Sequence, residues 1–305
     1  IRCADGRGPT GESPAAFNDQ EQFKIKAIQV AIIDIYQQRL SELRFNALYQ
    51  VAHHLIQNGC ALQLYKKIRE IFHALLDLWF QNKLMPCPDE VFLDTVKTLW
   101  DEHYHAANLV SKLVMRLDKS EKLKFQDQSE GQDKGPVKVE QGEAAPPPKA
   151  ERDDMRSKMS VIELGVQVFG ELFTSTAIDK CRKLMLSVVD CERSGEAAPN
   201  RNKLKGLTEM MVKIGLEGVY VPCLETSYLD EARAFYTVEA AENFLAMSTV
   251  DYLRKACKRL DEEAGRVDFC LHETTAPKIK DCLEQILIRD YDKKLIDKEG
   301  TGMHA

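Results

Sequence analysis

The sequence predicts an all-α fold, an elongated solenoid of two multi-helix repeats joined through a long disordered linker. The first observation is that apolar residues recur at spacings of three and four along most of the chain, as on one face of an α-helix. The second is that no segment shows the strict alternation of a half-buried β-strand. The third is a central stretch with almost no large apolar side chains. Two helical blocks around one linker are typical of an α-solenoid.

The first helical repeat is expected over residues 23–118, after a flexible N-terminal arm at residues 1–22 that holds several glycines and prolines. Apolar spacing predicts a first helix from Phe23 and a second over 45–56, which Gly59 ends. The remaining spacings in this block predict a third helix over 65–79, stopped by Pro86 and Pro88, and then one long helix or a broken pair over 96–117.

The linker is expected over residues 119–158. Nine basic and nine acidic residues leave this stretch without net charge, and Pro136 and Pro146 to Pro148 stiffen it. Such a segment cannot bury enough apolar surface to offset the entropy of ordering, so we expect an unstructured tether. A proline-rich ligand is the alternative.

The second helical repeat, with the start of the next, is expected over residues 159–305. Within it, the charged run from Arg259 to Arg266 is interpreted as the solvated side of a helix with local ion pairs. The apolar spacing predicts six helices here, over 161–172, 178–188, 204–214, 229–236, 252–267 and 279–286.

Composition argues against two classes of partner. The chain has 305 residues and a net charge of −6, which disfavours both nucleic acid and anionic membranes. No apolar run approaches the roughly 20 residues that cross a bilayer, and no signal peptide opens the chain. The nine cysteines are odd in number and dispersed, so we expect reduced core thiols in a protein of the cytoplasm and nucleus.

No pattern of residues indicates catalysis, a metal or a cofactor. The pairs His53 with His54 and His103 with His105 diverge on a helix, so we expect no metal site. Residues 6–11 match the dinucleotide pattern G-x-G-x-x-G, but no strand precedes them and no βαβ unit surrounds them. We therefore expect no catalytic residue and no cofactor.

Many separated blocks of the chain resemble the cullins, the scaffolds of multisubunit ubiquitin ligases. The similarity runs from about residue 23 to 298, except in the linker, and the blocks follow the order of the family. In the second repeat the blocks are VIELGVQVF, DKCRKLMLSVVDCERSGE, KIGLEGVY and FYTVEAAENFLAMSTVDYLRKACKRLDEEAGRVDFCLHETTAPKIKDCLEQILI. In the first repeat they are LRFNALYQVAHHLI, LYKKIRE and TLWDEHYHAANLVSKLVMRLDK.

The resemblance implies a scaffold that is not itself an enzyme and whose first repeat captures a substrate adaptor. The branch that uses BTB-domain adaptors is the most similar. The RING protein and the ubiquitin-conjugating enzyme are implied as partners only through a C-terminal part without counterpart in this sequence, and the arm at 1–22 can add to the adaptor contact. The positions that match adaptor-binding residues are Leu43, Phe45, Tyr49 and His53 on the second helix, and Arg116 and Lys119 on the fifth.

A helical wheel supports part of this assignment independently of the family. At about 100° per residue, Val51, Leu55, Leu48, Ala52, Phe45 and Ile56 form one continuous apolar arc, and Tyr49 and then His53 lie progressively off its edge. Residues at such a margin are usually half-exposed. On the wheel alone Tyr49 is a rim aromatic that covers the core, and the family position favours an adaptor contact instead.

Three features depart from the family pattern. Tyrosine is common where this chain has His53, an aromatic is common at Arg116, and the linker is longer than the usual connection. The first two positions bear on which adaptor is bound.

The sequence therefore predicts the N-terminal part of a non-catalytic cullin scaffold that recruits an adaptor, most simply of the BTB type, for ubiquitin-dependent degradation. The alternative is a helical-repeat module that binds linear peptides and has no role in ubiquitin transfer. A stand-alone enzyme has little support.

Overall fold

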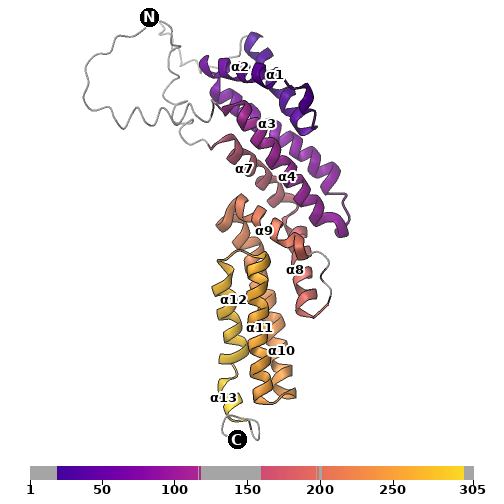
Figure 1. The fold of residues 1–305 in the computed structure, drawn as a ribbon, viewed down its shortest axis with the longest axis vertical. Coiled ribbons are helices and arrows are strands. Elements are labelled where there is room, and N and C mark those ends of the chain that lie inside the picture. The colour runs from indigo at the N-terminus through magenta and orange to yellow at the C-terminus, as the bar shows by residue number, and fades with distance from the viewer. Residues whose placement is uncertain (1–18, 116, 118–158, 197, 199–200, 299–305) are drawn as a thin grey trace, which may run out of the picture. The chain divides into compact units, whose positions relative to one another are not determined.

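The computed structural model describes residues 19–115, 117, 159–196, 198 and 201–298, which form helices joined by short turns (Figure 1). The predicted all-α fold class is confirmed for these residues. The expected arm lies outside them as far as residue 18, and the expected linker at 119–158 lies outside them completely.

Two compact units make up the chain. The first combines residues up to 72 with residues 105–164, and the second combines residues 73–104 with those from 165 onward. The two units therefore alternate along the sequence, whereas the expected repeats follow one another in chain order. The expected repeat boundaries stay a prediction.

Three helices contain the boundaries between the units: α3 (Ala61–Trp79), α4 (Asp89–Leu113) and α7 (Val161–Thr176). The region for which the spacing left one long helix or a broken pair is the single helix α4 as far as Leu113. The start of α7 is fixed by a capping box: the Ser160 backbone N–H donates to Glu163 Oε2 at 2.8 Å, and the Glu163 N–H donates to Ser160 Oγ at 3.3 Å.

In the first unit, α1 (Asp19–Tyr36) begins earlier than expected. Its first turn contains the acidic residues Asp19 and Glu21, whose charge is favourable beside the positive end of the helix dipole. The expected start at Phe23 is therefore corrected to Asp19. The apolar face of α1 lies in the core of this unit and includes Ile28, Ile32 and Ile35.

The helix α2 (Phe45–Gln57) follows the short 3₁₀ helix η1 (Leu40–Glu42) and ends as predicted. Gly59 has a φ of 81°, a left-handed conformation that glycine adopts without a steric penalty. Just beyond it the Cys60 N–H donates to the Leu55 carbonyl at 3.0 Å. This turn ends α2 and leads directly into α3.

In the second unit, an aromatic cluster packs around Phe169 of α7. Its ring centroid lies 5.5 Å from that of Phe80, 5.1 Å from that of Trp100 and 5.7 Å from that of His103. His103 Nε2 donates a hydrogen bond of 2.8 Å to the Gly165 carbonyl. Burial lowers the pKa of His103 to about 4, although this hydrogen bond acts in the opposite direction. His103 is therefore a neutral core residue at pH 7.

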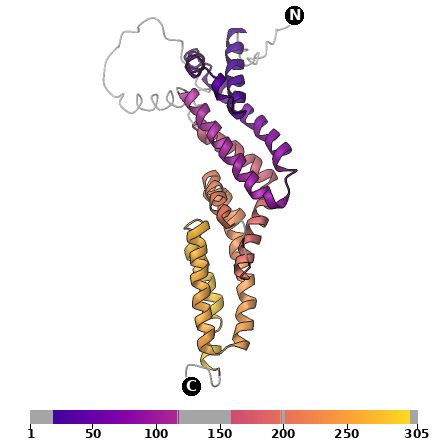
Figure 2. The ribbon, with the colours of Figure 1, turned by 45° about the vertical axis from the view of Figure 1, so that its right-hand side comes forward.

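The later helices of this unit include α10, α11 and α12, which lie side by side (Figures 1 and 2). Ser248 caps α11, because its hydroxyl accepts from the Asp251 N–H at 3.2 Å. The elements in order are α8 (Ile178–Arg193), α9 (Arg201–Gly215), η3 (Leu216–Glu225), α10 (Thr226–Ala246), α11 (Thr249–Cys270), α12 (Thr275–Glu284), η4 (Gln285–Arg289) and α13 (Asp292–Ile296). Of these, η3 and η4 are π-helices, as is η2 (Phe80–Leu84) after α3.

A buried charge network connects α8, α10 and α11. Glu263 of α11 is 1% exposed and accepts from Arg193 Nε of α8 at 2.9 Å. It also accepts from the Tyr236 hydroxyl of α10 at 2.7 Å and from the Tyr228 hydroxyl, and it pairs with Arg266. Burial alone raises the pKa of Glu263, but Arg193 and Arg266 outweigh burial and hold it at about 2.

This network corrects the interpretation of the run from Arg259 to Arg266 as a solvated helix side. Glu263 and Arg266 are buried, because Arg193, far away in sequence, supplies the counter-charge. The expected local ion pairs are confirmed in part, since Arg259 Nη1 contacts Glu262 Oε2 at 2.6 Å.

Glu263→Gln is expected to lower the free energy of unfolding by about 3 kcal/mol, because it removes the buried carboxylate that Arg193 and Arg266 share and leaves them only Asp190 and Glu192. Urea denaturation of the full chain measures this loss. The matched variant Asp261→Asn, at an exposed position of the same helix, should change stability by about 0.5 kcal/mol or less. Equal losses in the two variants would show that the network does not stabilise the fold.

The burial of His103 makes the free energy of unfolding depend on pH. The unfolded chain protonates His103 near its ordinary pKa of about 6.5, whereas the folded protein resists protonation down to about 4. The folded state therefore binds fewer protons in this window, and stability rises with pH. We expect His103 to contribute about 2 kcal/mol to the gain in stability between pH 5 and 7. His103→Gln keeps a donor for the Gly165 carbonyl but does not titrate, so it should remove this contribution. Urea denaturation of both proteins at pH 5 and pH 7 measures the difference.

Candidate functional site

The candidate site lies on α2 in the first unit. Ala52 and Leu55 are the fully buried residues of this helix, with 1% and 0% of their surface exposed. Gln50 and His54 are exposed on the other side of α2. The helix is therefore fixed to the core by one narrow face, and its flanks are open to contact.

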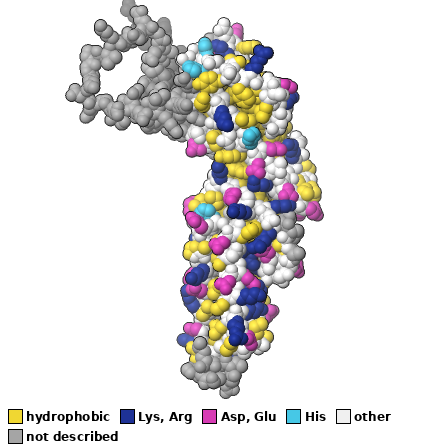
Figure 3. All heavy atoms as spheres, viewed as in Figure 1, with side chains coloured by type: hydrophobic (Ala, Val, Ile, Leu, Met, Phe, Trp, Pro, Cys, Tyr) yellow, Lys and Arg dark blue, Asp and Glu magenta, His cyan; other side chains and the backbone are white. Residues whose placement is uncertain are grey.

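One flank carries a row of half-buried side chains that we call the α2 strip: Phe45, Tyr49, His53 and Ile56. At about 100° per residue these four occupy neighbouring positions around the helix, next to the buried face. The rings of Tyr49 and His53 meet edge to face, with centroids 6.3 Å apart and an angle of 89° between their planes. In Figure 3, hydrophobic side chains gather over the N-terminal helices beside histidine side chains. The strip offers apolar and aromatic surface with one polar ring.

The structure brings several of the predicted site residues together. Tyr49 and His53 lie at one margin of α2, as the wheel predicts, and Phe45, which the wheel put inside the apolar arc, is half-buried beside them. Leu43 lies in the extended link before α2, is also half-buried, and donates its N–H to the Leu40 carbonyl at 3.2 Å. The predicted positions on the fifth helix, Arg116 and Lys119, lie outside the described residues. That any of these residues contacts an adaptor stays a prediction.

From the sequence alone, Ile56 belongs only to the continuous apolar arc of the helical wheel. In the structure Ile56 is half-buried and lies between Phe45 and Tyr49 around the helix, so it belongs to the strip. Its wheel position, at the edge of the arc nearest Tyr49, was the available signal. On the other side of the helix, Lys24 Nζ of α1 donates to His54 Nδ1 at 2.9 Å and joins α1 to α2.

Metal ligands, thiols and membrane spans were also considered as features of the described residues. Within the described ranges, no group of three or more histidine, cysteine or acidic side chains is arranged to hold a metal ion. The eight described cysteines are free thiols, of which four are buried, but Cys257 is exposed and is not the core thiol that we expected. No single described helix is long and apolar enough to span a membrane, and α7 with α8 meets that test only as a pair bent by 78°.

These features define a helical protein whose candidate site is a contact surface. Comparison with known families gives the family of this helical chain. The family described as the cullin alpha solenoid domain matches residues 25–304. The chain belongs to the cullin family, and the predicted family resemblance is confirmed.

Sequence identity to individual relatives shows which members of the family the chain is similar to. The chain is 24% identical over 282 residues to cullin-3 of Dictyostelium discoideum, covering 91% of this chain and 32% of the relative. It is 25% identical over 279 residues to cullin-3A of Arabidopsis thaliana, covering 90% and 33%. It is 22% identical over 270 residues to human cullin-4A, covering 86% and 31%. The chain thus spans about a third of the length of these relatives and resembles the cullin-3 branch.

Half-burial of Tyr49 has a consequence for stability. Tyr49→Ala is expected to lower the free energy of unfolding by less than about 1.5 kcal/mol, whereas Leu55→Ala, at a fully buried position of the same helix, should cost about 2–5 kcal/mol. Urea denaturation of both variants tests the difference. A loss at Tyr49 as large as that at Leu55 would make Tyr49 a core residue and remove it from the α2 strip.

Proposed function

We propose that the chain is the N-terminal, non-catalytic scaffold part of a cullin-RING ubiquitin ligase and that it recruits a BTB-domain substrate adaptor through the α2 strip. The observation that supports this proposal best is the strip itself. Three of its four residues, Phe45, Tyr49 and His53, stand at positions for which the resemblance to that cullin branch implies an adaptor contact.

The strip suits a contact with another protein for physical reasons. Aromatic side chains contribute large contact area with few rotatable bonds, and those at the centre of an interface often contribute more than about 1 kcal/mol each. Tyr49 and His53 already pack against each other, so binding fixes fewer free rotamers. An interface of standard size buries about 1,600 Å² in total, so neighbouring residues, Leu43 among them, would take part.

The role of the scaffold in this proposal is geometric. It holds an adaptor and its substrate at a set distance from the RING protein and the ubiquitin-conjugating enzyme, which raises their effective concentration. In cullins those two partners bind a C-terminal part, so we propose them as partners of the whole scaffold and not of these residues. Catalysis then belongs to the assembled ligase. We also propose that the protein acts in the cytoplasm and nucleus, where free thiols such as those described here persist.

Adaptor binding is tested by isothermal titration of the full chain against a panel of BTB-domain proteins and adaptors of the other cullin classes. We expect tight binding to BTB-domain proteins alone. Tyr49→Ala should weaken it tenfold or more, about 1.4 kcal/mol, because an aromatic contact at the interface is lost.

Gln50→Ala is the matched control, since Gln50 is exposed on the other side of the same helix. It should leave the affinity unchanged. Unchanged affinity in a folded Tyr49→Ala protein would contradict the assignment. Binding that tolerates changes at Tyr49 and His53 but is lost on changes in the second unit would favour the peptide-binding alternative.

A further inference from the structure

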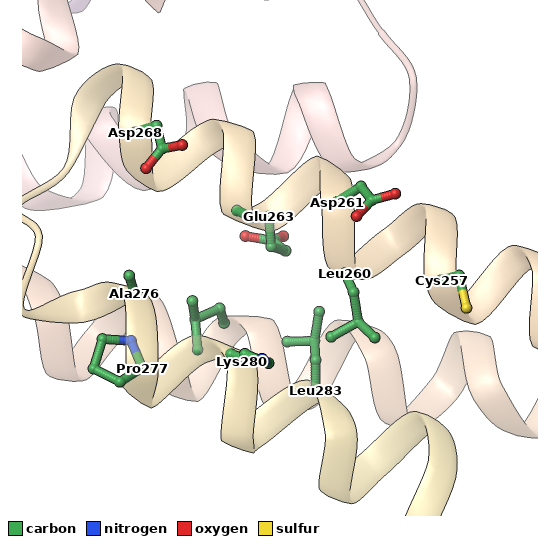
Figure 4. Close-up of a pocket in the computed structure, with 11 residues that line it drawn as sticks. Cys257, Leu260, Asp261, Glu263, Asp268, Ala276, Pro277, Lys280 and Leu283 are labelled. Carbon is green, nitrogen blue, oxygen red and sulfur yellow. The ribbon is translucent and has the colours of Figure 1, made fainter.

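A groove between α11 and α12 of the second unit is a second candidate for partner binding, and it does not depend on the α2 strip. Leu260 of α11 and Leu283 of α12 extend toward each other between the two helices (Figure 4). Ile279 and Leu283 are buried at the floor, Leu260 is half-buried, and Ala264 is exposed at the mouth. The base of the groove is therefore mostly apolar, although the buried and paired Glu263 also lines it, and the groove is open to solvent.

Its α11 rim carries uncompensated negative charge. Asp261 and Asp268 line the groove and are exposed, and neither has a basic partner among the described residues. They lie seven residues apart, which is two helical turns, or about 10 Å along the axis. On the α12 rim Lys280 also lines the groove, and its Nζ lies 3.9 Å from Glu284 Oε1 of the same helix.

A shallow surface of α11 adjoins the groove toward the start of that helix. Residues of α11 alone line it; it shares Cys257 and Asp261 with the groove and reaches Leu253 and Val250, which is 54% exposed. The stretch from Val250 to Asp268 covers eighteen residue steps, or about 27 Å of helix.

The charges of this adjoining surface are paired. Arg254 contacts Asp251 at 3.1 Å and Lys258 contacts Glu262 at 3.7 Å. Figure 3 shows acidic and basic side chains interspersed over the C-terminal helices, with hydrophobic side chains between them. The negative charge available to a ligand is therefore that of Asp261 and Asp268.

We propose that this groove binds an amphipathic helix of about five turns from a partner protein, with two lysine or arginine side chains seven residues apart that face Asp261 and Asp268. The exposed and half-buried apolar residues Val250, Leu253, Leu260 and Ala264 recur at spacings of three, four and seven, the pattern that the ridge of another helix fills. The described part of this unit has no strand, so it offers no sheet edge for an extended peptide. Charge complementarity selects a cationic occupant.

The test uses fluorescence anisotropy with the full chain and two synthetic helical peptides of eighteen residues. Both peptides carry the same leucine stripe, and two flanking positions seven residues apart are lysine in one and glutamate in the other. We expect saturable binding of the lysine peptide, at least tenfold tighter than that of the glutamate peptide. The double variant Asp261→Asn with Asp268→Asn should abolish this preference, and it should also remove most of the salt dependence of binding.

The matched control is the double variant Glu209→Gln with Glu242→Gln, which makes the same change in net charge at two exposed positions outside the groove. It should retain the preference for the lysine peptide. A third variant, Ala264→Arg, places a large side chain at the groove mouth and should block both peptides. Thermal unfolding verifies that each variant is folded.

Three outcomes would overturn the proposal. The first is no binding of either peptide, and the second is equal loss of binding in the two charge variants. The third is a chain that sediments as a dimer and becomes a monomer with Ala264→Arg. That result would show that a second copy of the chain occupies the groove. None of these outcomes changes adaptor binding at Tyr49, so failure here and failure of the proposed function are separate results.

Discussion

A carboxylate that is removed from water must be neutralised by the protein around it. In the second unit this carboxylate is that of Glu263, and three helices supply the groups that neutralise it. Arg193 reaches it from α8, Tyr228 and Tyr236 donate from α10, and Arg266 completes the pairing from α11 itself. Each partner is useful only if its helix keeps its axial position, because a displaced partner leaves an uncompensated buried charge. The network therefore penalises arrangements in which one of these helices is displaced along its axis.

Both candidate surfaces lie on helices that buried residues fix in place. On α11 the buried Glu263 fixes the helix and also lines the groove, and the less buried Leu260 lines it beside Glu263. On α2 the inner side is fixed by Leu55, and the flank presents Tyr49 and His53. A contact surface on a rigid element loses little conformational entropy when it binds. This is the property that a scaffold requires, since its function is to hold other proteins in place.

The sequence predicted what depends on local pattern and missed what depends on distant partners. Apolar spacing gave the helices, a terminating glycine gave the end of α2 at Gly59, and the wheel placed Tyr49 at the margin of the buried face. The burial of Glu263 was missed, because its counter-ion Arg193 lies seventy residues earlier in the chain. The π-helices were also missed, because spacings of three and four residues indicate an α-helix and do not reveal i→i+5 hydrogen bonding. The family resemblance located Leu43 and three residues of the strip but not Ile56, and no spacing rule shows what binds them.

The central claim is that α2 contacts a BTB-domain adaptor, and hydrogen exchange of the full chain with and without a bound BTB-domain protein tests it most directly. The account predicts slower amide exchange in the segment from Leu43 to Gln57 when the adaptor is bound. It also predicts unchanged exchange in α11 and α12, where the groove lies. Protection confined to α11 and α12, with none over α2, would contradict the account and assign partner binding to the second unit.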